Sequence, residues 1–404
     1  MVVLAALLLC AGCSTPGGDD DAPATTEPAA TTATAPAMAD DPAVDDADLA
    51  QPDDTAQTSA AAIAALPVEQ LAGELVMTKL AGPVASADEL DAISSGQVGS
   101  VILFGWNVQD RDQLRALVRS LDTARAAFAK RSGLPSGMLV SVDQEGGSIR
   151  NVPFAPPEHT QPALAAGSVD AAGEEARRAG EVLSDAGVSM DLGPVSDLAS
   201  GPNRTMAGRS FGSDPATVAR YVGATVRGLQ QGGVAAVAKH FPGFGASSAN
   251  SDEAVAYVDR SLAQLRAQEL VPFQAAVEAG VDAIMVSHGI HRELGSTLPG
   301  TLDERIATGL LRDELHFDGV AMTDSMNARG LREAWGDTVP RACPKAVAAG
   351  IDLVLLTGTM ETARLCRARI IHAVRDGELT IERVREAARR VEQLRHERAA
   401  AFVV

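Results

Sequence analysis

Two adjacent basic side chains, Lys239 and His240, stand where an apolar run meets a glycine-rich loop. The run from Gly233 to Ala238 is typical of a buried β-strand, and the segment from Pro242 to Gly245 then prevents any regular structure. An ammonium group donates hydrogen bonds and an imidazole can donate or accept them, so the pair suits the recognition of hydroxyl groups. Packing does not explain the pair, and lysine is scarce in the chain, which has only Lys79, Lys130, Lys239 and Lys345.

Polar residues also end four other apolar runs of strand-like length. They are Asp143-Gln144-Glu145, Asp191, Ser287-His288 and Asp324. If these runs are parallel strands of one barrel, their carboxyl ends meet at one face, where the chemistry of such barrels gathers. A purely structural explanation would need five separate exits to the surface. We therefore predict one functional site at this face.

The elements that must position these residues alternate in kind along the chain. Eight short apolar runs and longer amphipathic segments predict a single (β/α)8 barrel. A doubly wound open sheet is the alternative, but no Gly-x-Gly-x-x-Gly turn follows the first run. The predicted strands are Leu75–Leu80, Ser100–Phe104, Met138–Val142, Val188–Leu192, Ala235–Lys239, Ala283–Ser287, Val320–Thr323 and Asp352–Leu356.

The helical segments follow from apolar residues that recur near every third or fourth position. They are Asp112–Lys130, Ala172–Ala186, Pro215–Gln231, Leu262–Ala279, Leu302–Leu315, Val339–Ala349 and Ile381–Glu397. The spacing Thr301-x-x-Glu304 predicts a capping box at the start of the fifth of these helices.

Lys239-His240-Phe241-Pro242-Gly243 resembles the signature loop of glycoside hydrolase family 3, specifically its single-domain β-N-acetylhexosaminidase branch. Three other segments resemble the same family, and together they cover essentially the whole folded part: Asp143 to Gly147, Gly208 to Pro215, and Phe317 to Asp324. The resemblance implies retaining hydrolysis of terminal β-linked N-acetylglucosamine, as in cell-wall glycans or muropeptides. It also implies that the sugar is bound by Asp143, Arg209, Lys239 and His240.

Asp324 matches the family's catalytic nucleophile, which would attack the anomeric carbon and form a covalent glycosyl-enzyme. A carboxylate suits this step because the transition state resembles an oxocarbenium ion. An Asp at a strand end is commonly a helix N-cap instead. The register of Asp324 with the preceding Phe317-Asp318-Gly319 favours the nucleophile.

Asn250 and Asp252 stand where the family branch has the Asp and His of its general acid/base dyad. Asp252 could itself be the acid/base, which would make a two-carboxylate site with Asp324. A different residue could take the role instead, and the candidates are His159, His288 and Glu253. The third alternative is a catalytically impaired carbohydrate-binding lipoprotein, against which the retained Asp324 argues. We predict Asp324 and Asp252 as the catalytic pair.

A second departure from the family concerns position 151, where an Arg is usual and this chain has Asn151. Either a substrate contact is lost or Arg150, one place earlier, replaces it. No metal or organic cofactor is expected, since no cluster of residues has ligand spacing. Cys343 and Cys366 lie in predicted helices, and their spacing does not decide whether they form a disulfide.

The chain of 404 residues carries a formal charge of −19, which disfavours nucleic acid as a partner. Residues 1–13 resemble a lipoprotein signal that ends at Cys13, although Cys10 is unusual there and a basic start is missing. We expect translation to begin upstream. Residues 14–61 have the Ala, Thr, Pro and Asp composition of a disordered tether. We therefore expect residues 62–404 to form a barrel domain anchored by lipid on Cys13 to the outer face of the cytoplasmic membrane.

Overall fold

The computed structural model describes residues 61–134, 137–202 and 204–399. The expected signal segment, its Cys13, and the expected tether up to residue 60 lie outside the described residues. Among the residues described, no helix is both long and apolar enough to cross a membrane.

Eight parallel strands form the barrel, and their hydrogen-bonded order is β10-β1-β2-β3-β6-β7-β8-β9. A parallel bridge between Met322 of β9 and Leu353, just before β10, brings the two ends of the sheet together. This arrangement confirms the predicted (β/α)8 barrel. The strands are β1 (Val76–Lys79), β2 (Ser100–Leu103), β3 (Leu139–Val142), β6 (Met190–Asp191), β7 (Ala235–Phe241), β8 (Ala283–Val286), β9 (Val320–Thr323) and β10 (Val354–Leu356). A separate antiparallel pair follows β3 and consists of β4 (Gln144–Gly146) and β5 (Ile149–Arg150).

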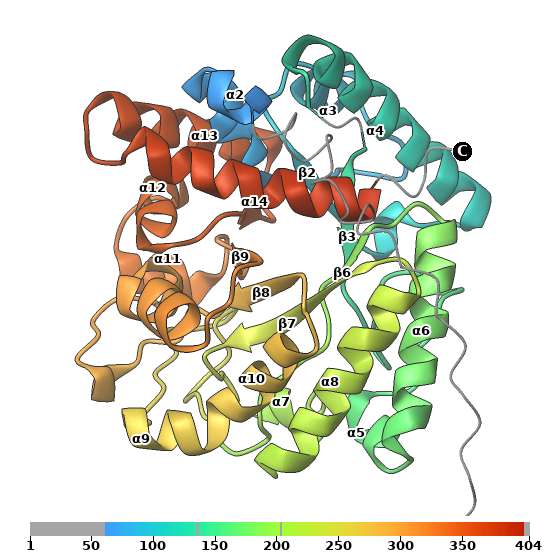
Figure 1. Cartoon of the computed structure of the whole chain (residues 1–404), viewed down its shortest axis with the longest axis vertical. Coiled ribbons are helices and arrows are strands. Elements are labelled where there is room, and N and C mark those ends of the chain that lie inside the picture. Colours follow the sequence, from blue (N-terminus) through green and yellow to red (C-terminus); the bar gives the residue numbers. More distant parts are fainter. Residues whose placement is uncertain (1–60, 135–136, 203, 400–404) are drawn as a thin grey trace, which may run out of the picture. The chain divides into compact units, whose positions relative to one another are not determined.

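Helices surround the barrel (Figure 1). They are α2 (Val68–Glu74), α3 (Ala87–Ser94), α4 (Arg111–Ser132), α5 (Gln161–Ala165), α6 (Val169–Asp185), α7 (Arg204–Ala207), α8 (Pro215–Gln231), α9 (Leu262–Gln264), α10 (Leu270–Glu278), α11 (Arg329–Trp335), α12 (Val339–Ala349), α13 (Met360–Arg375) and α14 (Ile381–Ala399). Two π-helical segments, Leu265–Glu269 and Arg305–Glu314, complete the turns between α9 and α10 and before β9. The seven predicted helical segments are all present, whereas α2, α3, α5, α7, α11 and α13 were not predicted.

The predicted capping box at Thr301 is wrong. A short 3₁₀ turn, Gly300–Leu302, precedes the π-helical segment, and Glu304, the residue just before that segment, makes no side-chain cap. The hydroxyl of Thr301 instead lies 2.8 Å from Nδ1 of His288 on the neighbouring loop. A tertiary partner has therefore replaced the local cap.

Side chains alternate along each strand between the barrel interior and the helical layer. Met77, Ile102 and Met322 belong to the interior cluster, while Val76, Val101 and Ala321 pack in the larger cluster beneath the helices. The same alternation directs the residues just beyond the interior positions toward the barrel axis at its carboxyl end. Those residues are Lys79, Phe104, Asp143, Lys239, Asp324 and Thr357.

Helix α14 closes the opposite, amino end of the barrel and lies across it in Figure 1. Its Val391 and Leu394 join the interior cluster. Arg395 donates to the carbonyls of Gly99 and Gly137, which precede β2 and β3. Arg395 also contacts Glu74 at 2.8 Å, within a fully buried group of charges from α2, α4 and α14. The barrel therefore has one sealed end and one open end.

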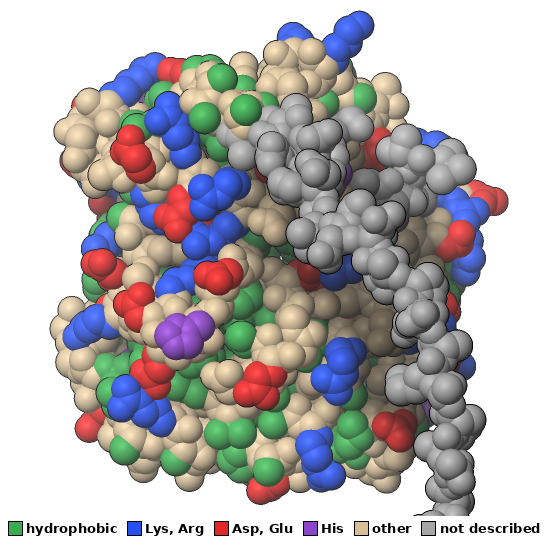
Figure 2. Space-filling model, in the orientation of Figure 1, with side chains coloured by type: hydrophobic (Ala, Val, Ile, Leu, Met, Phe, Trp, Pro, Cys, Tyr) green, Lys and Arg blue, Asp and Glu red, His purple; other side chains and the backbone are tan. Residues whose placement is uncertain are grey.

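The outer helices carry two further features. A disulfide joins Cys343 of α12 to Cys366 of α13, which resolves the alternative that the sequence left open. On the face shown in Figure 2, Lys and Arg side chains are interspersed with Asp and Glu rather than gathered by sign.

Candidate active site

A cavity of about 210 Å³ occupies the carboxyl end of the barrel. It is smaller than the roughly 300–1,000 Å³ typical of sites for drug-sized ligands, so it suits a single sugar ring. The structure brings all six predicted site residues to its wall. These are Asp143, Arg209, Lys239, His240, Asp252 and Asp324.

Lys239 lies at the centre of a group of opposite charges on one side of the cavity. Its ammonium is 2.5 Å from Oδ1 of Asp143 and 2.7 Å from Oε1 of Glu145. Arg209 holds the same Glu145 with two hydrogen bonds, from Nε at 2.8 Å and from Nη2 at 2.6 Å. Paired contacts of this kind fix a guanidinium in both position and orientation.

Glu145 contacts both Lys239 and Arg209. From the sequence it was predicted only to lie at the polar end of a strand. Burial alone would raise its pKa, but the charges of Lys239 and Arg209 outweigh that effect and lower it to about 2. The pKa of Lys239 moves the other way: its burial is outweighed by Asp143 and Glu145, which raise the pKa. Glu145 and Lys239 are therefore charged at neutral pH, and this side of the cavity presents fixed hydrogen-bonding groups to a ligand.

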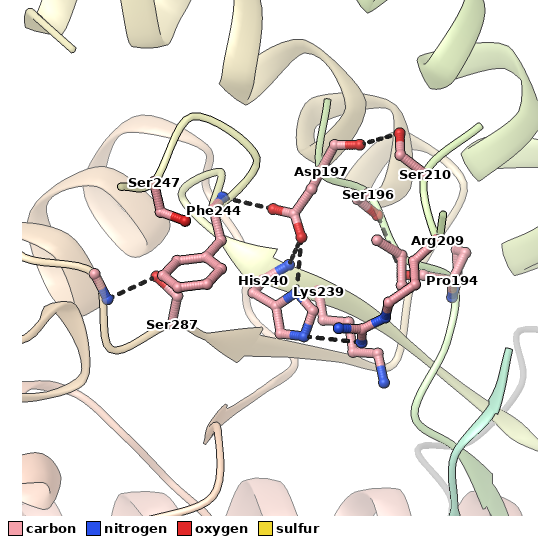
Figure 3. Close-up of polar contacts among 12 residues, drawn as sticks. Pro194, Ser196, Asp197, Arg209, Ser210, Lys239, His240, Phe244, Ser247 and Ser287 are labelled. Atoms are coloured by element: carbon pink, nitrogen blue, oxygen red, sulfur yellow. Dashed lines mark hydrogen bonds and ion pairs between the residues drawn. The ribbon is translucent and has the colours of Figure 1, made fainter. Parts of the chain in front are cut away.

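His240 is oriented by Asp197, which the sequence did not single out. Oδ2 of Asp197 lies 2.7 Å from Nδ1 of the ring, and Oδ1 accepts the backbone N–H of Phe244 at 2.6 Å (Figure 3). Because a carboxylate can only accept, Nδ1 carries a proton that it donates to Asp197. Nη2 of Arg209 lies 3.5 Å from Nε2. Asp197 follows β6 by several residues in an irregular segment, and no pattern in the sequence marks it.

Asp324 stands at the end of β9, and its Oδ1 accepts the N–H of Ser325 at 2.6 Å. Burial would raise the pKa of Asp324, but the nearby His288 and His240 and the Ser325 hydrogen bond lower it overall. His288 helps to fix the backbone next to Asp324, because its Nε2 lies 2.8 Å from the carbonyl oxygen of Ser325. Asp324 therefore remains ionised, as a nucleophile requires.

Asp252 lies on the loop between β7 and α9, at the mouth of the same cavity. Its side chain is exposed, but shielding from solvent by neighbouring groups and the negative charge of Asp324 raise its pKa. The backbone N–H of Asp252 donates to Oδ1 of Asn250 at 3.1 Å, so Asn250 shapes the turn.

The other candidates for the acid/base lie elsewhere. His159 and Glu253 are exposed and do not line the cavity. Both ring nitrogens of His288 are already engaged, with Thr301 and Ser325. In the described part of the chain, no group of three or more His, Cys, Asp or Glu side chains is placed to hold a metal ion.

Arg150 is not among the residues that line the cavity, and its guanidinium lies 3.9 Å from Glu158. Asn151 has a structural role instead. Its Nδ2 donates to the carbonyl of Asp143, and its Oδ1 accepts the N–H of Gly105, both at 2.9 Å. Asn151 thus joins the loops that follow β2 and β3.

Residues 68–394 match the sequence model of the glycosyl hydrolase family 3 N terminal domain. A beta-hexosaminidase of Stenotrophomonas maltophilia (strain K279a) is 34% identical over 291 residues, which cover 70% of this chain and 83% of that relative.

Two solved structures are similar to this barrel. A family 3 β-N-acetylglucosaminidase from Paenibacillus sp. str. FPU-7 is 32% identical with a TM-score of 0.79 over 84% of this chain, which spans 64% of the Paenibacillus chain. A β-N-acetylhexosaminidase from Beutenbergia cavernae DSM 12333 is 29% identical with a TM-score of 0.75, over 82% of this chain and 99% of that one. The chain belongs to glycosyl hydrolase family 3 and is a glycoside hydrolase.

Proposed function

We propose that this protein removes terminal β-linked N-acetylglucosamine from glycans, including cell-wall fragments, with retention of configuration. The observation that carries the proposal is that the carboxyl groups of Asp324 and Asp252 line one cavity together with Asp143, Arg209 and Lys239. The pKa of Asp324 is lowered and that of Asp252 is raised. These directions agree with the roles of a nucleophile, which must be ionised, and of an acid, which must hold a proton. The names of the relatives support the choice of sugar.

The reaction follows from these two roles. Asp324 attacks the anomeric carbon and forms a covalent bond, while Asp252 gives its proton to the departing glycosidic oxygen. Asp252 is then ionised and takes a proton from water, whose oxygen attacks the same carbon and releases Asp324. The first half-reaction needs Asp252 protonated, which its raised pKa favours.

The charged groups on the far side of the cavity would bind the sugar. Asp143 can accept hydrogen bonds from two hydroxyls, whereas Lys239 and Arg209 donate. Asp143 keeps 23% of its side-chain surface exposed, although it contacts Lys239. Its carboxylate is therefore still accessible to a ligand.

The alternative is a catalytically impaired carbohydrate-binding protein. The exposure of Asp252 favours this alternative. Among the residues that the structure describes, its carboxylate has no hydrogen-bond partner. In the family dyad implied by the resemblance, a second residue orients the acid. Asn250 contacts only the backbone of Asp252.

Hydrolysis of an activated aryl β-N-acetylglucosaminide and of a natural disaccharide separates these alternatives. Loss of general acid catalysis typically lowers the rate by roughly 10²- to 10⁴-fold. We expect Asp252→Ala to lose this much on the disaccharide and far less on the aryl substrate, whose leaving group needs little protonation. Asp324→Ala should abolish both activities.

Different results would lead to different conclusions. Wild-type cleavage of the aryl substrate alone, unaffected by Asp252→Ala, would favour the binding protein. If wild type cleaved neither substrate and no glycosyl group could be trapped on Asp324, the hydrolase would need a different sugar.

We also propose, from the sequence alone, that Cys13 carries the lipid that anchors the protein to the outer face of the cytoplasmic membrane. One acyl chain binds a membrane only marginally, so full lipoprotein modification would be needed. The wild type should then sediment with membranes and Cys13→Ser should remain in the soluble fraction. Equal partitioning of the two would contradict the anchor.

A further inference from the structure

Trp106 is a large apolar side chain at the open end of the barrel that is 55% exposed. Among the described residues, only Val84 and Leu365 are also exposed large hydrophobic residues. Trp106 is one of two tryptophans in the chain. A tryptophan offers a large apolar face and one polar N–H, which suits contact with an amphipathic ligand such as a sugar.

The backbone that carries Trp106 is held firmly. Trp106 is the middle residue of a short 3₁₀ turn, Gly105–Asn107, that follows β2. Asn107 is buried, accepts the N–H of Phe104 at 2.9 Å, and donates to the carbonyls of Leu80 and Gly82. The exposed indole is therefore displayed by an ordered turn.

The indole is continuous with the wall of the cavity. Phe104 lines the cavity, and its ring stacks on that of Trp106 with 4.5 Å between centroids and 13° between planes. Asn151 ties Gly105 of the same turn to the backbone of Asp143, a predicted sugar-binding residue. The turn that carries Trp106 therefore has a fixed position relative to Asp143.

A cation lies beside the indole. Lys79 belongs to the inward-facing positions of β1, and its Nζ is 5.9 Å from the centroid of the Trp106 ring. Lys239 contacts two carboxylates, whereas no ion pair or hydrogen bond is recorded for the ammonium of Lys79 among residues 61–399 that the structure describes. An ammonium without a carboxylate partner next to an apolar ring is suited to an anionic, ring-shaped ligand.

The size of the cavity indicates which part of a substrate would reach Trp106 and Lys79. The cavity of about 210 Å³ suits one sugar ring, so the group attached to that sugar must leave through the mouth. The charged groups that would bind the first ring come from β7 and from the segments that follow β3 and β6. The wall at β2 and β10 is formed instead by Phe104, Leu355 and Thr357, and Trp106 adjoins that side.

We propose that Trp106 and Lys79 form a second subsite, which binds the leaving-group sugar of the substrate. The C–H face of that sugar stacks on the indole, and an acidic substituent on it pairs with Nζ of Lys79. This subsite rests on the proposed hydrolase function, and its test is designed to fail separately from that function.

The kinetic test uses three substrates with the same N-acetylglucosamine but different leaving groups. They are the β-fluoride, which has no leaving-group ring, the neutral disaccharide di-N-acetylchitobiose, and β-1,4-N-acetylglucosaminyl-glucuronic acid. We expect Trp106→Ala to lower kcat/KM about tenfold on both disaccharides and to leave the fluoride within about twofold. Trp106→Phe should retain most of the activity. Lys79→Met should lower kcat/KM about tenfold on the acidic disaccharide alone.

Leu365→Ala is the matched control, because Leu365 is another exposed large apolar residue, lies on helix α13 and does not line the cavity. It should change none of the three activities. An equal loss on all three substrates in Trp106→Ala would indicate a structural role and overturn the subsite. Unchanged activity on both disaccharides would overturn it as well.

A binding measurement keeps the subsite testable even if none of the substrates is cleaved. The only other tryptophan, Trp335, can be replaced by Phe, so that emission reports Trp106 alone. With Asp324→Ala in addition to prevent turnover, the acidic disaccharide should change the emission, and N-acetylglucosamine alone should not. No change with the disaccharide, or the same change with both ligands, would overturn the subsite.

Discussion

Asp252 and Asp324 carry the same functional group, yet their surroundings shift their pKa values in opposite directions. Asp324 is at the end of a strand, near two histidines and with a backbone N–H donor. Asp252 is on a loop, near the negative charge of Asp324. The division of labour in the proposed reaction therefore depends on neighbours rather than on residue type.

A different position at the residue scale gives the next prediction. Asp197 accepts from the ring and the backbone N–H of His240 and from the backbone N–H of Phe244. In Asp197→Asn, one oxygen becomes an NH₂ group that faces these donors. Hydrogen bonds to charged groups contribute about 1.5–3 kcal/mol, so we expect kcat/KM to fall by roughly 10- to 100-fold.

The substrate dependence of this loss distinguishes it from a defect in the acid. Because His240 would contact the sugar common to all substrates, Asp197→Asn should affect the aryl substrate and the disaccharide equally. Asp185→Asn, which alters an exposed ion pair with Arg111, is the matched control and should leave activity unchanged. Full activity of Asp197→Asn would show that His240 does not need this partner.

At the scale of elements, the strands could be predicted because a barrel strand is a short apolar run whose pattern is local. All eight runs are strands, and Pro215–Gln231 and Val339–Ala349 are helices with the predicted bounds. Helix α13 was missed although Thr359 caps it by accepting from Thr362. Its sequence mixes arginine with apolar residues, and tertiary packing rather than a clear period sets its inner face.

Local patterns fail where a distant partner decides. The capping box at Thr301 gave way to His288, and Asp197 acts on a histidine 43 positions away. Neither contact leaves a trace in the neighbouring sequence. The six site residues could be predicted because they lie in family motifs. Glu145 lies in the same motif as Asp143 and could have been predicted from it too. The position of Trp106 beside the cavity could not be predicted from the sequence, because it depends on how the turn after β2 folds.

At the scale of the molecule, one buried histidine should link stability to pH. His291 is fully buried, and within the described residues neither of its ring nitrogens has a hydrogen-bond partner. Burial lowers its pKa from 6.5 to about 4, against an opposing effect of Asp303. Its neighbour Ile290 pairs with Ala256 and Val258 on the loop that carries Asp252.

The unfolded chain therefore binds a proton near pH 6.5, while the folded chain does so only near pH 4. The contribution of His291 to the free energy of unfolding should fall as the pH drops through this window, by on the order of 3 kcal/mol. His291→Gln should remove this part of the slope in urea titrations between pH 4 and pH 8. His372→Gln, on the exposed side of α13, should keep it. A slope that His291→Gln does not change would contradict the assignment.

The sealed end of the barrel also bears on the order in which the protein is assembled during synthesis. Glu74 emerges early from the ribosome, but its partner Arg395 lies 321 positions later. Until residues 381–399 have been made, the carboxylate of Glu74 lacks that partner and the interior cluster lacks Val391 and Leu394. The amino end of the barrel can therefore close only after α14 has been synthesised. We expect an unfinished chain to be less tightly folded than the complete one.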